Sequence, residues 1–451
     1  MSATSEPFRQ ELNTTFRLAL PLVGGQLASV GMSFVDTVMA GRLGAKDLAA
    51  IAVGGAAWAA VMLFMTGVLM ALPPVVAELR GARRGGEIAS AAWQGAWIAL
   101  ALAVAIVALI GNLGWLLRLL DVEPEIVPTV VGYLRALRWG VPALALYFVL
   151  RFVNDGVGQT RPTLYFGVVG LPVNVFANYV LMYGHFGAPR LGAVGCGYAT
   201  SIVWLVQCIG LALYTQRSAV FREIGLFHRL VPPRSRELAD LWSVGLPIGV
   251  AIFMEASLFS VVAILIGSLG TEIVAGHQVA LNFAALTFMV PLGISMAISV
   301  RVGFRLGERD LAGLHRAAKA GFFLVLGAQL ISATLMVSIP RWIAGIYTRD
   351  PAVIGIAAEL LLLAALFQLS DGVQVSVAGA LRGLKDTRAV MIITVIAYWI
   401  VGLPVGWYLG FPADFGAHGM WVGLIAGLTA AAVLLSVRLR RRLRDLRASL
   451  A

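Results

Sequence analysis

Long apolar segments alternate with short polar ones along the whole chain. Twelve apolar segments can be separated, each of roughly 20–27 residues and therefore long enough to cross a bilayer as a helix. They lie at about 16–40, 48–73, 90–110, 129–153, 164–184, 193–214, 241–266, 277–300, 320–339, 354–380, 389–410 and 416–437. The pattern predicts an all-α integral membrane protein with twelve transmembrane helices.

The composition supports this interpretation. The chain has 451 residues, of which 59% are hydrophobic and only 13% are charged, and its mean hydropathy is +0.87. Soluble domains carry roughly 25% charged residues. The net charge of +11 does not indicate a nucleic-acid partner, because the basic residues lie between apolar segments rather than along one polar face.

The distribution of Lys and Arg predicts the orientation. With the N-terminus inside, 26 of these residues fall in cytoplasmic segments and 6 in outer loops, while Arg135 and Arg138 lie near the outer part of the fourth helix. This asymmetry predicts that both termini are cytoplasmic. The first residues lack a basic region followed by a cleavage site, so no signal peptide is expected.

The chain also contains an internal duplication. Matching residues recur at offsets of 224 to 227, and they include Pro21 with Pro247, Gly44 with Gly270, Gly156 with Gly383, and Gly192 with Gly416. Each half has an even number of helices, so the halves should form two six-helix lobes related by a pseudo-two-fold axis along the membrane normal. We expect an N-terminal lobe at 1–220, a cytoplasmic linker at 221–240, and a C-terminal lobe with a basic tail at 241–451.

Three acidic residues lie well inside apolar segments: Asp36, Glu255 and Asp371. A carboxylate at mid-membrane costs at least ~2.5–3.5 kcal/mol, and such residues usually mark an ion path. The alternative for Asp371 is a structural role, in which Ser370 or Gln374 satisfies it. Under the duplication none of the three acids falls on another acid, so they are not part of the repeated scaffold.

Glu255 and Asp371 both reach the middle of a ~30 Å hydrocarbon core. Two carboxylates that meet in a low-dielectric interior cannot both carry a charge without a counter-charge. No Lys or Arg lies near mid-depth on either helix. We therefore expect a mobile partner, either a bound sodium ion or a shared proton.

Amides accompany these acids. Asn174 and Asn178 lie four residues apart, which places both on one helical face, and Asn154 ends the fourth helix. Gln278 and Asn282 have the same spacing in the eighth helix. The first group is expected around Asp36 and the second around Glu255 and Asp371. The alternative for each amide is an ordinary interhelical hydrogen bond.

Three further residues are candidates by position. Phe367 stands one turn before Asp371, where its ring would either face a cation or simply pack. Pro21 in the first helix and Pro247 in the seventh would either act as hinges that free carbonyl groups or mark local bends.

The energy source is expected to be an ion gradient. The sequence contains no Gly-x4-Gly-Lys-[Ser/Thr] loop and no segment for a soluble nucleotide-binding domain. No pair of its five histidines has metal-ligand spacing. No cofactor is expected, and the three acids are spread over three helices, which does not favour an intramembrane enzyme.

Four stretches resemble the MATE family of multidrug efflux antiporters, in particular its NorM-like branch. They are SFVDTVMAGRLG (33–44), MEASLFS (254–260), AGHQVALN (275–282) and SDGVQVSVAGALRGLKDT (370–387). The likeness covers nearly the whole chain. It implies two six-helix lobes that flank a central cavity.

The resemblance also implies roles for the acids. Glu255 and Asp371 would form a cation or proton site in the C-terminal lobe, with Na⁺ as the favoured ion. A second polar site in the N-terminal lobe would consist of Asp36, Asn154, Asn174 and Asn178. Some relatives have a tyrosine where this chain has Phe367, so a hydroxyl ligand for sodium is missing at that position.

We therefore expect a monomeric exporter of amphipathic, mostly cationic drugs, coupled to Na⁺ or H⁺ and embedded among lipids in a bacterial inner membrane. A carboxylate cavity attracts cations, and an apolar lining accepts many shapes. The main alternative is a lipid-linked oligosaccharide flippase of the same plan, which would need cationic residues facing its cavity. A passive channel is a further alternative.

Overall fold

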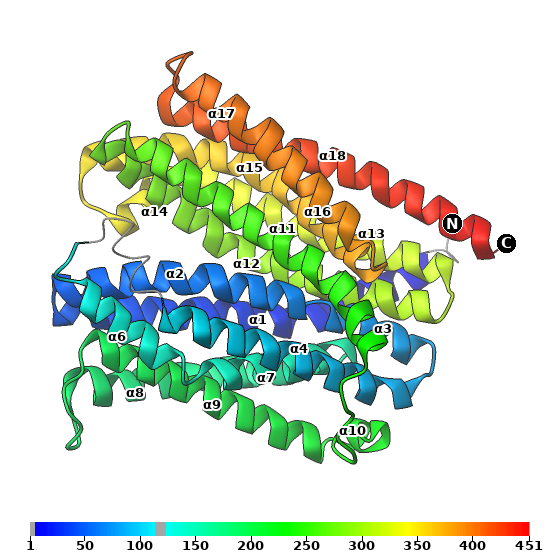
Figure 1. Cartoon of the computed structure of the whole chain (residues 1–451). Coiled ribbons are helices and arrows are strands. Elements are labelled where there is room, and N and C mark those ends of the chain that lie inside the picture. The colour runs from blue at the N-terminus through cyan, green and yellow to red at the C-terminus, as the bar shows by residue number, and fades with distance from the viewer. Residues whose placement is uncertain (1–4, 113–122, 451) are drawn as a thin grey trace. The chain divides into compact units, whose positions relative to one another are not determined.

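Helices make up all the regular structure in residues 5–112 and 123–450, which the computed structural model describes. The elements of the first half are α1 (Ser5–Leu43), α2 (Ala45–Leu69), α3 (Leu72–Gly81), α4 (Gly85–Gly111), α6 (Val127–Leu137), α7 (Val141–Gly156), α8 (Arg161–Tyr183), α9 (Ala193–Arg217) and α10 (Ala219–Ile224) (Figure 1). Those of the second half are α11 (Ser235–Gly267), α12 (Thr271–Gly307), α13 (Leu311–Ser338), α14 (Pro340–Tyr347), α15 (Pro351–Gly383), α16 (Thr387–Val395), the π-helix η1 (Ile396–Gly402), α17 (Leu403–Gly410) and α18 (Gly416–Leu450).

Most of the predicted spans are single long helices, and three are interrupted, the first of them being 48–73, which passes from α2 into α3. By length and composition, 11 helices of the described part are able to cross a membrane, or up to 12 if one bent pair counts as a span. That pair is α6 and α7, which bend by 48° within the predicted segment 129–153. Pro142 is the second residue of the second helix of the pair, and it has no N–H with which to continue the first. The predicted segment 389–410 comprises α16, η1 and α17.

The chain divides into two compact units whose boundaries fall inside helices. One unit contains Met1–Val23 and Val250–Ala451, and the other contains Gly24–Gly249. Each boundary lies two residues after a proline, Pro21 in α1 and Pro247 in α11. The beginning of α1 therefore belongs to the unit built mainly from the second half, an exchange that the hydrophobic pattern does not predict.

The internal repeat is visible in the backbone. Gly44 and Gly270 precede the second helix of each half with φ of 141° and 133°, values open to glycine alone. Arg83 and Arg309 both have φ of 59°, an uncommon conformation for a residue with a Cβ. Both pairs are 226 residues apart. The two halves therefore share turn geometry as well as sequence.

The repeat extends to helix packing. A Cβ at Gly156 in α7 would lie 2.8 Å from the carbonyl oxygen of Pro73, and a Cβ at Gly383 in α15 would lie 2.8 Å from that of Ser299. Such a separation is too short for any side chain, so both positions need glycine. In the unit that contains Val250–Ala451 this close packing sets α15 directly against α12, and α15 also packs against α13, α14 and α18.

Candidate functional site

Asp36 forms a polar site with two amides in the unit Gly24–Gly249. Its Oδ1 accepts hydrogen bonds from Asn174 Nδ2 at 3.0 Å and from Asn178 Nδ2 at 2.6 Å. Both donors lie on α8, one turn apart, and are buried. The structure thus brings together three residues that the sequence assigned to one site.

Small residues allow α1 and α8 to approach closely enough for these bonds. A Cβ at Gly25 would lie 2.8 Å from Thr163 Cγ2, and a Cβ at Gly167 would lie 3.4 Å from that of Ala28. Asp36 lies about two turns after Ala28 on α1, and the short distance between α1 and α8 brings its carboxylate within hydrogen-bond distance of the two amides. The thiol of Cys196 on α9 also interacts with Asp36, a contact not expected from the sequence.

Asn154 is bonded elsewhere. Its Nδ2 donates to Leu150 O at 2.8 Å and to Thr215 Oγ1 at 2.9 Å, so it joins α7 to α9. Its neighbour Asp155 accepts a hydrogen bond from Thr163 Oγ1 at 2.7 Å and lies 3.8 Å from Arg151. Asn154 is therefore not a donor to Asp36 in this structure and makes the interhelical bond of the alternative interpretation.

Glu255 on α11 and Asp371 on α15 lie close enough to interact electrostatically in the other unit. Asp371 is 3% exposed, and Glu255 is half-buried. Among the described residues neither carboxylate has a hydrogen-bond or salt-bridge partner. The structural alternative for Asp371 named Ser370 or Gln374 as its partner; in the described structure neither bonds to it, and Ser370 bonds Thr429 at 2.9 Å instead.

Tyr398 and Arg382 join this acidic pair, and the sequence analysis identified neither. Tyr398 on η1 is 1% exposed, interacts with both carboxylates, and has no hydrogen-bond partner for its hydroxyl. Arg382 is 9% exposed and interacts with Glu255 from the end of α15. The expectation of a wholly mobile counter-charge is therefore incomplete, because one resident cation acts on Glu255. Tyr398 is a polar aromatic residue within an apolar segment, and this feature of the sequence could have identified it as a candidate.

The remaining candidates near this pair make other contacts. Phe367 is buried and packs edge-on against Phe259 and Trp421, with ring centroids 6.0 and 5.8 Å apart. Gln278 and Asn282 are exposed, and Asn282 donates to the backbone oxygen of Gln278 at 2.8 Å. None of the three hydrogen-bonds to either carboxylate.

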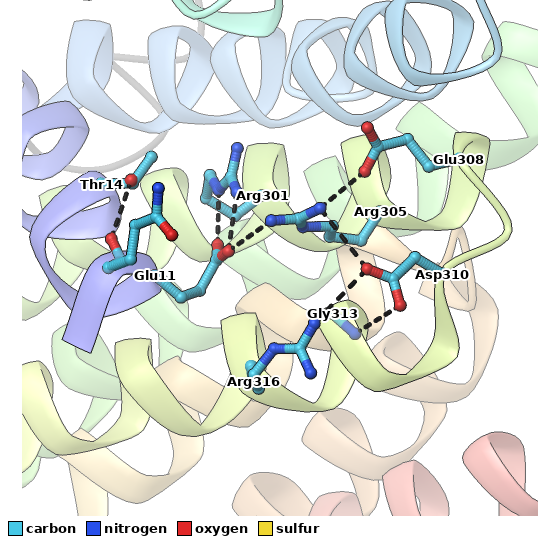
Figure 2. Close-up of polar contacts among 9 residues, drawn as sticks. Glu11, Thr14, Arg301, Arg305, Glu308, Asp310, Gly313 and Arg316 are labelled. Atoms are coloured by element: carbon cyan, nitrogen blue, oxygen red, sulfur yellow. Dashed lines mark hydrogen bonds and ion pairs between the residues drawn. The ribbon is translucent and has the colours of Figure 1, made fainter. Parts of the chain in front are cut away.

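An ionic cluster lies near the start of α1 (Figure 2). The carboxylate of Glu11 binds Arg301 and Arg305 on α12, and Arg305 in turn binds Glu308 at 2.8 Å and Asp310 at 3.5 Å. Glu11 lies before the predicted start of the first span at residue 16, where a charged residue does not stand out from the sequence. The cluster ties α1 to α12 within one unit.

A multidentate metal centre is not part of the described structure, since no group of three or more His, Cys, Asp or Glu side chains there could hold a metal ion.

Comparison with known proteins decides the family. The sequence profile of the MatE family matches twice, over residues 21–180 and 247–408. This chain belongs to the MatE family. The two matches coincide with the two halves of the internal repeat, and the resemblance inferred from the sequence is confirmed. The MatE family consists of transporters. The protein is therefore a multi-pass membrane transporter and not an enzyme.

Two MatE relatives from bacteria are similar over nearly the whole chain. Multidrug resistance protein PmpM of Pseudomonas aeruginosa is 45% identical, covering 97% of this chain and 92% of the relative. Probable multidrug resistance protein NorM of Shewanella oneidensis is 44% identical, covering 94% and 93%.

Solved MatE structures confirm the fold. A crystal structure of a MATE protein in the bent conformation has a TM-score of 0.89 at 19% identity and covers 100% of this chain and 99% of that one. The eukaryotic transporter AtDTX14 has a TM-score of 0.87 at 17% identity, covering 99% and 100%.

Proposed function

We propose that this protein exports amphipathic, mostly cationic drugs from a bacterial cell in exchange for Na⁺ or H⁺. The relatives that are 41–45% identical over nearly their full length are named multidrug resistance proteins. The observation that carries the coupling mechanism is the pair Glu255 and Asp371, two carboxylates without hydrogen-bond partners in the described structure.

The charge balance of this pair sets the coupling stoichiometry that we propose. When both are ionised, Glu255 and Asp371 carry two negative charges, and Arg382 places one positive charge near Glu255. An uncompensated buried charge is strongly destabilising. One further monovalent cation, or one proton, neutralises the group. A cationic drug that enters removes the need for that ion, and the two therefore compete.

A cavity within the unit Gly24–Gly249 offers an apolar surface on which a drug could bind. It has a volume of about 870 Å³ and lies between α1 and α8, with Phe34, Met39, Phe176 and Tyr179 in its lining. Its size is within the range of drug-binding pockets. Aromatic faces attract cations, and Val35 in the lining is the neighbour of Asp36. The Asp36 site is therefore proposed to assist drug binding or release.

Movement between conformations is proposed to occur at Pro21 and Pro247. Each proline removes a backbone hydrogen bond from its helix, and each stands two residues from a boundary between the compact units. A helix that is weakened there bends at low cost. The same arrangement in both halves agrees with an alternating-access mechanism.

We infer that both termini are cytoplasmic and that the protein acts as a monomer in the inner membrane. The orientation is supported by the excess of Lys and Arg in the segments on that side.

Transport by purified protein tests the proposal. Proteoliposomes receive a sodium or a proton gradient, one at a time, and the movement of a cationic drug is followed. Asp371→Asn keeps size and hydrogen bonding but removes the titratable charge, so coupled transport should fall to background. Glu359→Gln is the control on the same helix, because Glu359 is 66% exposed. Wild-type transport by Asp371→Asn would rule out the coupling site.

A further inference from the structure

A groove lies between α13 and α18, with α15 as its floor. Both outer helices pack on α15, and the cavity between them has a volume of about 560 Å³. It opens near the beginning of α13 and the end of α18. All three helices are long and apolar enough to span a membrane.

The groove has a basic rim. His315 and Lys319 contribute from α13, four residues apart, and Arg440, Arg444 and Arg447 contribute from α18 at intervals of four and three residues. These spacings place each set on one helical face. The two basic faces therefore border the same opening.

The floor and walls of the groove are mostly apolar. They include Phe322 on α13, Val373, Val377 and Ala380 on α15, and Leu439 on α18, with Ser376 and Ser436 as polar members. Val377 and Ala380 are buried. A small inorganic anion would contact only the basic residues of the rim and would leave the apolar floor of the groove exposed.

In the described part of the chain Lys319, Arg440 and Arg444 lack acidic partners, whereas neighbouring arginines have them. Arg316 on α13 lies 3.6 Å from Asp310, and Arg438 on α18 lies 2.7 Å from Asp386. Within the described residues no carboxylate lies within salt-bridge distance of Lys319, Arg440 or Arg444. Their positive charge is thus available to an external anion.

We propose that this groove binds one anionic phospholipid, with its phosphate between the α13 and α18 cations and an acyl chain along the apolar floor. A basic pocket between spanning helices is a known way to hold an acidic lipid headgroup. The groove belongs to membrane-spanning helices, so a lipid is the ligand with direct access. In the orientation proposed above, the lipid comes from the cytoplasmic leaflet.

The floor helix connects this site to the coupling site. Val373 follows Asp371 by two residues on α15, and a bound acyl chain would rest on the helix that carries this acid. An acidic lipid would thereby stabilise one position of α15. This last consequence rests on the proposed function, whereas lipid binding itself does not.

Native mass spectrometry of the delipidated protein tests the site. Dioleoyl phosphatidylglycerol and dioleoyl phosphatidylcholine are titrated separately into wild type, Arg444→Gln and Arg441→Gln. Arg441 is exposed, lies three residues away on the same helix, and does not line the groove. Phosphatidylglycerol should bind more tightly than phosphatidylcholine. Arg444→Gln should weaken it about fivefold, as expected for one basic contact, and Arg441→Gln less than twofold.

A second variant tests the apolar floor. Ala318→Trp fills the groove from α13 without a change in charge, and it should weaken binding of phosphatidylglycerol. Ala318→Leu replaces it if the tryptophan variant unfolds. Equal effects of Arg444→Gln and Arg441→Gln, or no effect of the filling variants, would overturn the proposal. Displacement of phosphatidylglycerol by an equal concentration of inorganic phosphate would identify a free-anion site instead.

Discussion

The carboxylate of Glu11 accepts two hydrogen bonds from the guanidinium of Arg301, at 2.7 and 2.8 Å (Figure 2). A third bond, from Arg305, has a length of 2.8 Å. The paired geometry is the strongest form of a charge-assisted bond, and Glu11 is only 3% exposed. This pair explains why the first residues of α1 belong to the unit that contains α12.

Replacement of Glu11 by Gln should destabilise the protein. The variant leaves Arg301, which is 12% exposed, without a carboxylate, and removal of one partner from a buried pair costs about 3 kcal/mol. Unfolding in detergent micelles, followed by circular dichroism, measures the change. Glu308→Gln removes a more exposed member of the cluster and should cost at most about 1 kcal/mol. Equal losses of unfolding free energy in the two variants would show that the Glu11–Arg301 pair stabilises the protein no more than an exposed ion pair does.

Replacement of Tyr398 by Phe should weaken ion binding without a loss of stability. The ring remains in the core, and the hydroxyl that disappears has no hydrogen-bond partner in the described structure. If the hydroxyl is a ligand of the coupling ion, its loss costs roughly 1 kcal/mol, or about fivefold in affinity. Sodium titration monitored by tryptophan fluorescence gives the affinity. Tyr408→Phe, on an exposed tyrosine of α17, is the control and should leave it unchanged. The same affinity in both variants would exclude Tyr398 from the site.

The sequence predicted the Asp36 site better than the Glu255 site, for a physical reason. Asn174 and Asn178 lie on a regular helix, where a spacing of four residues places both amides on one face. Tyr398 lies on a π-helix just before Pro404, and its direction does not follow the period of an α-helix. The hydrophobic pattern of the segment 389–410 does not predict the π-helix.

Helix ends account for the other omissions. The predicted apolar segment ends at residue 380, which leaves Arg382 outside the span. In the structure α15 continues to Gly383, and the side chain of Arg382 is buried. Glu11 lies before the predicted start of the first span at residue 16, although α1 begins at Ser5. Hydrophobic periodicity locates the middle of a membrane helix and gives little information on polar turns that pack against other helices.

Replacement of Arg382 by Gln should tighten cation binding at the Glu255 and Asp371 pair. The variant removes a resident positive charge, so the carboxylates attract an external cation more strongly. A single charge at intermediate distance is worth on the order of 1–2 kcal/mol, which corresponds to about tenfold in apparent sodium affinity. Sodium titration of the purified variant measures it. Arg388→Gln, an exposed charge in α16, should change the affinity less than twofold. Weaker binding in Arg382→Gln would show that Arg382 does not compete with the ion.

Replacement of Asp36 by Asn should slow drug transport at least about tenfold while sodium binding by the other unit persists. The side-chain oxygen of the introduced amide can still accept hydrogen bonds from Asn174 and Asn178, so the junction of α1 and α8 is preserved and only the charge is lost. Drug transport in proteoliposomes and sodium titration in micelles are measured on the same preparation.

Thr37→Val provides the control for this experiment on α1. Thr37 is exposed, and its hydroxyl donates to Ser33 O of its own helix at 2.9 Å, with no second partner among the described residues. The control should transport at nearly the wild-type rate. Because Asp36 and the Glu255 pair belong to different compact units, loss of charge at one should not abolish ion binding at the other. A loss of sodium binding in Asp36→Asn would contradict two separate sites, since Glu255 and Asp371 remain intact in that variant.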